Sequence, residues 1–327
     1  MNLSTHTPKV GVAAITVMVL ILAVATSPVA AKGISDKAGT TGFSFLKLGV
    51  GSKAVAMGGA FTGVADDPTT LYYNPAGSIN LQGRQFLAGY HNYVIDIQSG
   101  FLALTIPFMT TRRLGFFVDY LNFGSFTETD NSGIPTGNFS GGDILIGANF
   151  ATPVRAGFSA GINLKFMSEI AAGYSSEAMA VDIGGFYRFK DGLTKAGLAV
   201  YNLGGVLSGF SEGSAGEHKD KLPMGIRAGL SHSLRELPVV VALDGVLPND
   251  NDPYLNAGIE LYKFKPLYAR LGYSTFGENY KTGSGSDTWG GFAAGFGLDY
   301  QNYHFAYAFM PYLDLGSSHR VTVSGGF

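Results

Sequence analysis

Charged residues recur at regular intervals after residue 84, and they are the residues best placed to do chemistry. They carry both signs and stand among glycines and large apolar residues. The candidates are Asp119, Lys165, Asp182, Arg188, Arg227, Asp244, Glu260, Arg270 and Asp299, with Asp143 and Lys195 in the same pattern. Mixed charges of this kind can form structural ion pairs, and they can also contact a polar group of a transported molecule. No two acids stand out as a pair for hydrolysis.

Three other motifs have weaker chemical interpretations. The run Gly49-Val50-Gly51-Ser52-Lys53 has the composition of a phosphate-binding loop but not its spacing. The six histidines are scattered without the spacing of a zinc site. The run Asn249-Asp250-Asn251-Asp252 can hold calcium, although a solvated turn is the simpler interpretation. We therefore predict no cofactor, no metal and no enzymatic activity; a hydrolase assembled from separate loops, which leaves no local motif, is the alternative.

The composition narrows the class of protein. Only 14% of the 327 residues are charged, well below the roughly 25% of soluble domains. The formal net charge of -2 excludes the basic surface of a nucleic-acid-binding protein. Beyond the N-terminus, no apolar stretch is long enough to cross a bilayer as a helix. The absence of cysteine excludes disulfides and thiolate metal sites.

Residues 1–31 have the pattern of an export signal. Lys9 supplies a positive charge, residues 10–25 are apolar, and Pro28-Val29-Ala30-Ala31 ends in small residues. Cleavage after Ala31 is expected. An uncleaved membrane anchor is the alternative, because the apolar stretch is almost long enough to span a bilayer.

From residue 84 onward, large apolar residues alternate with small or polar ones. For example, Ile162, Leu164 and Phe166 alternate with Asn163 and Lys165. A period of two over about ten residues is the strand signature of a membrane barrel. The predicted strands are 84–93, 98–108, 113–122, 141–151, 155–168, 177–189, 193–203, 222–232, 237–247, 254–263, 267–275, 288–299, 302–312 and 319–327. Their number, fourteen, is even, as in bacterial single-chain barrels.

The connections between these strands support the count. Those after the even strands are short, whereas most of those after the odd strands are longer and polar, notably 124–140, 204–221, 248–253 and 276–287. Short periplasmic turns and longer outer loops are typical of outer-membrane barrels. Aromatic residues near the strand ends predict two girdles at the membrane surfaces. They are Tyr90, Tyr93, Phe108, Tyr120, Phe123, Phe150, Tyr187, Tyr254, Tyr262, Trp289, Tyr300 and Tyr312.

On each strand, the residues that alternate with the large apolar ones then face the lumen, and the charged candidates would lie there. A barrel of fourteen strands is wider than one whose own side chains fill it, so something must enter it. Residues 32–83 are rich in small and apolar residues and are predicted to form a hatch inside the barrel, which comprises residues 84–327. The predicted partners are outer-membrane lipid and the barrel assembly machinery, with no nucleic acid.

The two ends of the chain carry recognisable motifs. Near the N-terminus stand Phe45-Leu46-Lys47-Leu48-Gly49-Val50-Gly51-Ser52-Lys53-Ala54, Met57-Gly58-Gly59-Ala60-Phe61, Ala65-Asp66-Asp67 and Tyr72-Tyr73-Asn74-Pro75-Ala76-Gly77. At the C-terminus stand Leu315-Gly316 and His319-Arg320-Val321-Thr322-Val323-Ser324-Gly325-Gly326-Phe327. Together they resemble the PorV/PorQ family, which is related to the FadL transporters of hydrophobic compounds. Asn74-Pro75-Ala76 resembles the Asn-Pro-Ala of the FadL hatch.

The resemblance implies a fourteen-stranded barrel with a hatch whose motif comprises Asp66, Asp67, Asn74, Pro75 and Ala76. It also implies that Phe327 is the terminal aromatic residue used in outer-membrane assembly. PorV acts in type IX secretion and passes exported proteins to a surface attachment complex. FadL members pass hydrophobic molecules, such as long-chain fatty acids, through the hatch and a side opening in the wall.

We therefore predict an outer-membrane protein of PorV/PorQ type that serves protein export or transport. FadL-like passive uptake of hydrophobic compounds and a non-conducting docking barrel are the alternatives. The third predicted strand shows no clear kink that would mark a side opening. The external loops look short for holding a protein cargo.

Overall fold

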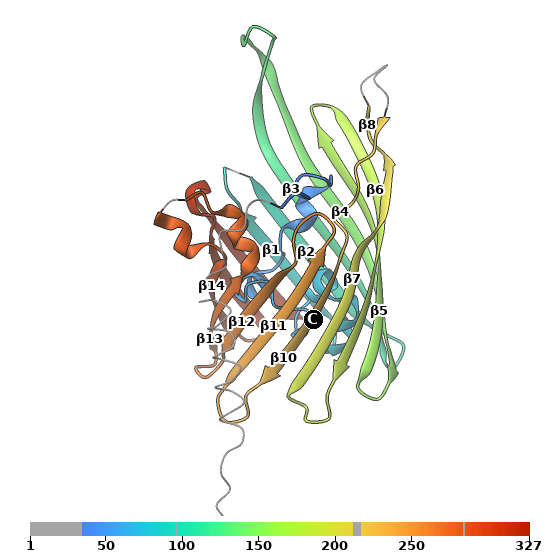
Figure 1. Cartoon of the computed structure of the whole chain (residues 1–327). Coiled ribbons are helices and arrows are strands. Elements are labelled where there is room, and N and C mark those ends of the chain that lie inside the picture. Colours follow the sequence, from blue (N-terminus) through green and yellow to red (C-terminus); the bar gives the residue numbers. More distant parts are fainter. Residues whose placement is uncertain (1–34, 96, 212–216, 284) are drawn as a thin grey trace, which may run out of the picture. The chain divides into compact units, whose positions relative to one another are not determined.

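The structure is a computed structural model that describes residues 35–95, 97–211, 217–283 and 285–327. The predicted export signal, residues 1–31, and the first residues of the predicted hatch lie outside the described residues. In the described part of the chain, fourteen strands form one closed antiparallel barrel (Figure 1). The predicted architecture of the barrel is therefore confirmed.

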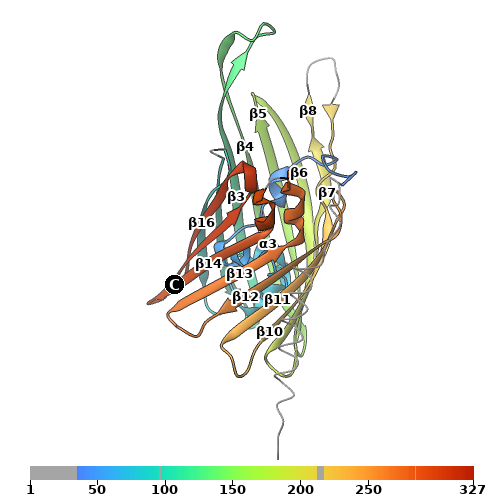
Figure 2. The same cartoon turned by 60° about the vertical axis from the view of Figure 1, so that its left-hand side comes forward.

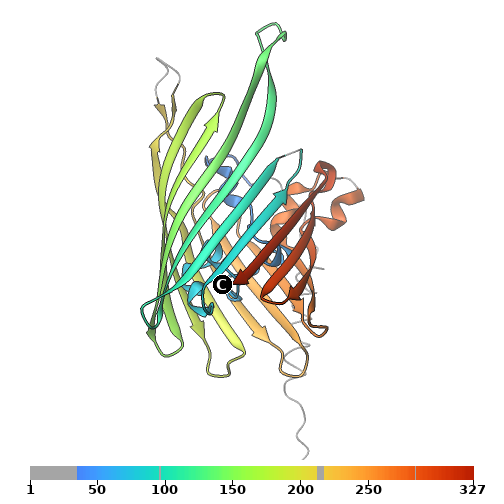
Figure 3. The ribbon, with the colours of Figure 1, turned by 180° about the vertical axis from the view of Figure 1, so that it is seen from behind.

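The barrel strands follow one another around the wall with a single interruption. They are β1 (Gln85–Asn92), β2 (Gln98–Phe108), β3 (Arg112–Thr129), β4 (Pro135–Arg155), β5 (Phe158–Ala171), β6 (Tyr174–Arg188), β7 (Thr194–Ser208), β10 (Gly225–Ser233), β11 (Val239–Pro248), β12 (Tyr254–Leu261), β13 (Leu267–Ser274), β14 (Phe292–Tyr300), β15 (Tyr303–Pro311) and β16 (Ser317–Gly326). β7 pairs with β10, because β8 (Phe210–Ser211) and β9 (Glu217–His218) form a separate hairpin. β1 pairs with β16 along its whole length and closes the wall (Figure 3).

The two ends of the barrel differ in their connections. At one end, here named the turn end, strands such as β2 and β3 or β14 and β15 are joined by two to five residues. The opposite loop end carries the longer connections, including the short helices η4 (Thr275–Tyr280), η5 (Gly285–Trp289) and η6 (Leu313–Leu315), which Figure 2 shows in orange to red. Only the connections of β7 to β10 and of β13 to β14 are longer than five residues, and the other loop-end connections have two to five, so the predicted asymmetry holds only in part.

The prediction that residues 124–140 form an outer loop is wrong. Most of it belongs to β3 and β4, which stay paired from Ser125↔Ser140 to Thr129↔Pro135 and form a hairpin that projects beyond its neighbours (Figures 1 and 2). The rings of Phe126 and Phe139 stack on this hairpin with centroids 5.4 Å apart. These strand extensions have no apolar lipid face, so the alternation that predicted the other strands is missing there.

Other differences are local. The pairing of β3 with β4 shifts register between Asn122 and Ser125, and Gly124 has a φ of 80°, so β3 contains an irregularity that the sequence did not indicate. The pairing of β6 with β7 shows a similar register shift between Val181 and Ile183. The strand predicted to begin at 288 begins at Phe292, because η5 precedes it. Strand pairing continues on both sides of each shift.

The outer surface of the barrel is apolar. Ile162, Leu164 and Phe166 are exposed, whereas Asn163 and Lys165 between them are buried inside, so the predicted alternation holds. Large apolar residues face outward on many other strands. They include Leu102, Phe116, Ile146, Leu198, Leu230, Leu271 and Phe296. Among the described residues, no helix is long and apolar enough to cross a membrane.

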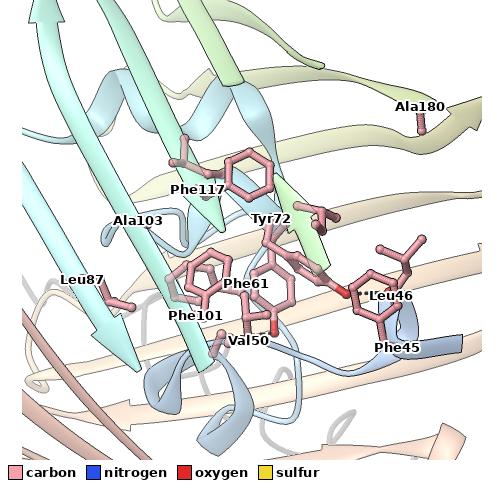
Figure 4. Packing of buried hydrophobic residues seen from close by; sticks show 14 of the residues in the cluster. Phe45, Leu46, Val50, Phe61, Tyr72, Leu87, Phe101, Ala103, Phe117 and Ala180 are labelled. Atoms are coloured by element: carbon pink, nitrogen blue, oxygen red, sulfur yellow. Dashed lines mark hydrogen bonds between the residues drawn. The ribbon is translucent and has the colours of Figure 1, made fainter. Parts of the chain in front are cut away.

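Residues 35–83 are here named the N-terminal segment. Most of the segment packs against the inner face of the wall, whereas residues 36–40 are exposed. The segment forms four short helices: η1 (Ser44–Lys47), α2 (Ser52–Ala56), α3 (Thr70–Tyr73) and η2 (Pro75–Asn80). Phe61 and Tyr72 of the segment pack with Phe101 and Phe117 of the wall in one buried cluster (Figure 4). The Tyr72 hydroxyl donates a hydrogen bond to the Leu46 carbonyl at 2.5 Å. The core of the molecule is therefore shared between the segment and the wall.

Candidate functional site

Glycines on the inner face of the wall allow the segment to touch it directly. The glycines at these contacts include Gly161, Gly184, Gly197, Gly229, Gly258, Gly272 and Gly295. A methyl group at Gly272 would collide with the backbone of Gly58, and one at Gly161 would collide with the backbone of Pro75. Glycine in a strand marks such a close approach of another backbone. Here these residues are named the glycine ring.

The Asn-Pro-Ala motif fastens the segment to this ring. The side chain of Asn74 donates to the Gly185 carbonyl at 3.1 Å and accepts from the Ala76 amide at 3.1 Å. The Pro75 carbonyl accepts from Asn149 Nδ2 at 3.1 Å. Asn74 is fully buried, so its hydrogen bonds replace those it would make with water. The structure gives these residues an anchoring position.

At the turn end, a network of ion pairs joins the segment to the wall through Lys53 and Glu260. Lys53 Nζ lies 2.9 Å from Glu260 and 2.8 Å from Asp66, and Arg270 Nε lies 2.6 Å from Glu260. Burial by itself would lower the pKa of Lys53, but the carboxylates of Asp66 and Glu260 outweigh it and raise that pKa above its ordinary value. These four residues, here named the turn-end network, border an open vestibule of about 530 Å³. The neighbouring Asp67 accepts a hydrogen bond from the backbone of Thr69.

Two further predicted lumen residues form another buried pair. Lys165 Nζ lies 2.6 Å from Asp182, and both side chains are almost completely buried. Lys165 also donates to Asn202 at 2.9 Å. Nearer the turn end, Asp299 accepts hydrogen bonds from Tyr268 and bonds to His304 Nδ1. In both places the charge is satisfied by neighbouring protein groups.

The remaining predicted lumen residues are dispersed. Asp119 borders a small cavity of about 20 Å³, and Arg188 donates to Asn80 at 2.8 Å. Lys195 donates to the Val64 carbonyl at 3.4 Å. Neither carboxylate oxygen of the buried Asp143 has a hydrogen-bond partner among the described residues. The structure therefore does not bring all the predicted residues together into one site.

Phe327 lies outside the lumen. Its side chain is exposed, and its amide donates to the Arg84 carbonyl at 3.2 Å beside the seam between β1 and β16.

A cavity of about 140 Å³, here named the loop-end cavity, lies between the segment and the wall. Its lining is unusually aromatic. The aromatic side chains are Tyr72, Tyr73, Tyr201, Tyr254, Phe276, Tyr280 and Tyr312. Burial raises the pKa of Tyr73 to about 12, so its hydroxyl stays protonated. Tyr254 and Tyr312 were predicted in the membrane girdles, which is wrong: both line this cavity because they lie on the inner side at the strand ends.

Arg227 and Asp244 are the predicted lumen residues that border the loop-end cavity. The Arg227 guanidinium lies 4.2 Å from the ring centroid of Tyr201 and 5.5 Å from that of Tyr73. Asp244 Oδ2 accepts hydrogen bonds from the amides of Phe61 and Thr62. Asp244 thus holds the segment, whereas Arg227 stacks on aromatic rings.

The sequence interpretation missed several residues of this cavity. Arg320 also borders it and is almost fully buried. Its inward position follows from the parity of β16, because Val321 next to it is exposed. Tyr72 and Tyr73 stand directly before Asn74 of the hatch motif, but no local pattern showed which part of the wall they would face.

Comparisons with known proteins identify the fold. No family model and no curated protein matches the chain. Among solved structures, it is similar to the Pseudomonas putida toluene transporter TodX, with 15% identity, a TM-score of 0.55, and coverage of 84% of this chain and 96% of that one. The monoaromatic hydrocarbon channel CymD matches at 14% identity and a TM-score of 0.55, over 85% of this chain and 98% of that one.

A Pseudomonas aeruginosa FadL homologue matches at 11% identity and a TM-score of 0.51, over 84% of this chain and 96% of that one. At such low identity the likeness concerns the path of the chain rather than individual residues. The chain therefore has the fold of the FadL-type channels.

Proposed function

We propose that the protein is a passive channel of the outer membrane that carries hydrophobic small molecules across the barrel lumen. The observation that carries this proposal is the loop-end cavity, an aromatic space inside the wall and beside the N-terminal segment. Seven aromatic side chains line it, and aromatic side chains are typical of the lining of sites for small ligands. The apolar outer surface suits contact with lipid. The alternative of FadL-like uptake thus has more support than protein export.

The solved structures with this fold support the same proposal. TodX is a toluene transporter and CymD is a monoaromatic hydrocarbon channel. In the proposed route, a molecule enters at the loop end, rests in the cavity and leaves past the turn-end network. The ion pair of Lys53 with Glu260 must then open, because it joins the segment to the wall on that path.

The test is uptake of toluene by cells of a Gram-negative host that lacks its own hydrocarbon channel. Intact cells are needed because hydrocarbons cross plain phospholipid vesicles unaided. Ala293 lines the cavity, whereas the next residue, Ala294, belongs to the outward parity of β14. Ala293→Phe fills the cavity, and Ala294→Phe adds the same ring to the outer surface.

We expect the wild-type protein and Ala294→Phe to raise the rate of toluene entry, and Ala293→Phe to abolish most of that increase. Equal membrane levels of the three proteins, measured after fractionation, make the rates comparable. No increase with the wild-type protein would contradict the proposal and favour a non-conducting docking barrel. If Ala293→Phe leaves the increase in toluene entry unchanged, the cavity does not lie on the route.

A second candidate is protein export of PorV/PorQ type, and one observation favours it. The projecting hairpin of β3 and β4 carries exposed Phe126, Ile134 and Phe139, so the outer loops offer a longer surface than the sequence indicated. Exposed apolar residues can form a protein contact where they make a contiguous patch. The test is recovery of a secreted protein with the wild-type chain and its loss with Phe126→Ser and Phe139→Ser together. If the double substitution does not change the recovery, the hairpin is not the contact for the secreted protein.

A further inference from the structure

The loop-end cavity contains a cation that the protein itself does not neutralise. Elsewhere in the lumen, Lys53 and Arg270 share Glu260, and Lys165 pairs with Asp182. No carboxylate of the described residues lies within 4 Å of the Arg227 guanidinium. Its buried Nε has no hydrogen-bond partner among them either. Arg227 is half-buried, and a cation that has lost part of its water is stabilised when something else supplies the opposite charge.

The two carboxylates that border the cavity are engaged elsewhere. Asp244 Oδ2 accepts from two amides of the segment, and its Oδ1 is buried against the wall at Gly229. Asp250 Oδ2 accepts from Lys47 at 3.0 Å and from Thr41 at 2.7 Å. Both acids are therefore turned toward protein groups.

The summed charge of the lining is positive. Three cations, Lys47, Arg227 and Arg320, and two acids, Asp244 and Asp250, border the cavity, so the balance is 3 − 2 = +1. The Nε atom of Arg320 is buried and has no hydrogen-bond partner among the described residues. Two guanidinium groups with free donors thus border one aromatic space. Guanidinium is the side-chain group that best matches a carboxylate, because its planar fork can bind both oxygens.

The size of the cavity restricts the rest of the ligand. Its volume is about 140 Å³, and an apolar cavity of about 150 Å³ accommodates one benzene molecule. Tyr254, Tyr280 and Tyr312 offer ring faces and edges to such a molecule, and the rings of Tyr280 and Tyr312 already lie 5.0 Å apart. A long acyl chain does not fit this volume. A neutral hydrocarbon would fit, but it would leave the Arg227 charge unpaired.

We infer that the loop-end cavity is a binding site for one-ring aromatic carboxylates, with the ring among the tyrosines and the carboxylate on Arg227. This inference rests on the proposed function, because it narrows the ligand of the same lumen. The carboxylate supplies the missing negative charge, and the ring of Tyr201, 4.2 Å from the guanidinium, holds it in place. Recognition is therefore divided between one ion pair and a set of ring contacts.

The test is calorimetric titration of the purified protein in detergent micelles with sodium benzoate at pH 7. Benzoate stays in water under these conditions, so partition into micelles does not imitate binding. Two comparison ligands separate the contributions: toluene has the ring without the charge, and hexanoate has the charge without the ring. We expect benzoate to bind more tightly than either. Toluene or hexanoate binding as tightly as benzoate would overturn the inference.

Substitution of the cation sharpens the test. Arg227→Gln should weaken benzoate binding about ten- to a hundred-fold, as expected when a charge-assisted hydrogen bond is lost. Arg188→Gln is the matched control, because Arg188 carries the same charge outside the cavity and bonds to Asn80. It should leave the affinity unchanged. Arg227→Lys keeps the charge without the planar fork and should give an intermediate affinity.

The outcomes separate this inference from the proposed function. Toluene uptake by cells without measurable benzoate binding would overturn the inference and leave the channel proposal standing. Benzoate binding that depends on Arg227, in a protein that gives no uptake, would support the site and contradict the channel. Benzoate binding that Arg227→Gln does not weaken would also overturn the inference. If Arg227→Gln does not fold, the wild-type ranking of the three ligands decides by itself.

Discussion

The turn-end network and the loop-end cavity lie in the same lumen, but the charged side chains are paired in the first and partly unpaired in the second. At the turn end, Lys53, Asp66, Glu260 and Arg270 satisfy one another at distances of 2.6 to 2.9 Å. At the loop end, Arg227 stacks on tyrosine rings and has no acid partner within the described residues. Paired charges hold two parts of a protein together, whereas an unpaired cation beside a cavity remains available to a ligand. The position of a charge on the inner face therefore does not define its role; its partners do.

The largest expected effect comes from removing the element that both regions share. Deletion of residues 32–83, with the export signal retained, should convert a nearly non-conducting barrel into an open pore, because a fourteen-stranded wall does not fill its own interior. Single-channel conductance in planar bilayers measures the change. Circular dichroism of the deleted protein checks that the barrel has formed. Equal conductance of the two folded forms would mean that the N-terminal segment does not plug the lumen.

The next effect contrasts the two kinds of charge directly. Glu260→Gln leaves two buried cations without their shared acid and should lower the free energy of unfolding by about 3 to 5 kcal/mol. Arg227→Met should change it by about 1 kcal/mol or less, because lost stacking on Tyr201 is offset by removal of an unpaired charge. Urea unfolding in lipid vesicles, followed through the fluorescence of Trp289, the sole tryptophan, gives both values. Equal losses of unfolding free energy for the two variants would show that the two regions do not differ in how their charges are satisfied.

A smaller effect is expected from the glycine ring. Gly272→Ala forces a methyl group against the backbone of Gly58, and overpacking of this kind costs about 1 to 3 kcal/mol. Gly245→Ala is the matched control, since a methyl group there meets only Leu255 at an ordinary distance. Urea midpoints give the loss of stability, and conductance shows whether the segment is displaced. A Gly272→Ala protein as stable and as closed as the control would show that the contact is not tight.

The sequence predicted the wall well because lipid imposes a strict rule on it. An outward polar residue is costly in a membrane, so side chains such as Leu164 and Lys165 must alternate. The rule does not extend to the projecting hairpin, where Phe126 and Phe139 stack without a lipid face, and there the prediction of a loop was wrong. The alternation of residues along β10 could place Arg227 on the inner face of the barrel. It could not indicate that Arg227 lacks an acid partner, because partners come from strands and segments distant in the sequence.

The tyrosines show a second limit of sequence interpretation. Tyr254 and Tyr300 both stand at strand ends, and their rings suit a membrane surface equally well. Tyr300 is exposed, whereas Tyr254 borders the loop-end cavity. Parity separates them, because Tyr254 shares the inward parity of Glu260 whereas Tyr300 stands next to the inward Asp299. Parity does not show which part of the segment Tyr254 faces. The cavity could therefore not be found from local spacing.

The glycine ring has a consequence for the genetics of the chain. Because the wall at Gly272 and the segment at Gly58 meet backbone to backbone, neither surface can gain volume alone. A damaging substitution in the ring should be suppressed by second-site changes in the segment and not by changes on the lipid-facing side of the same strand. The two stretches of sequence, more than two hundred residues apart, are thus constrained to change together.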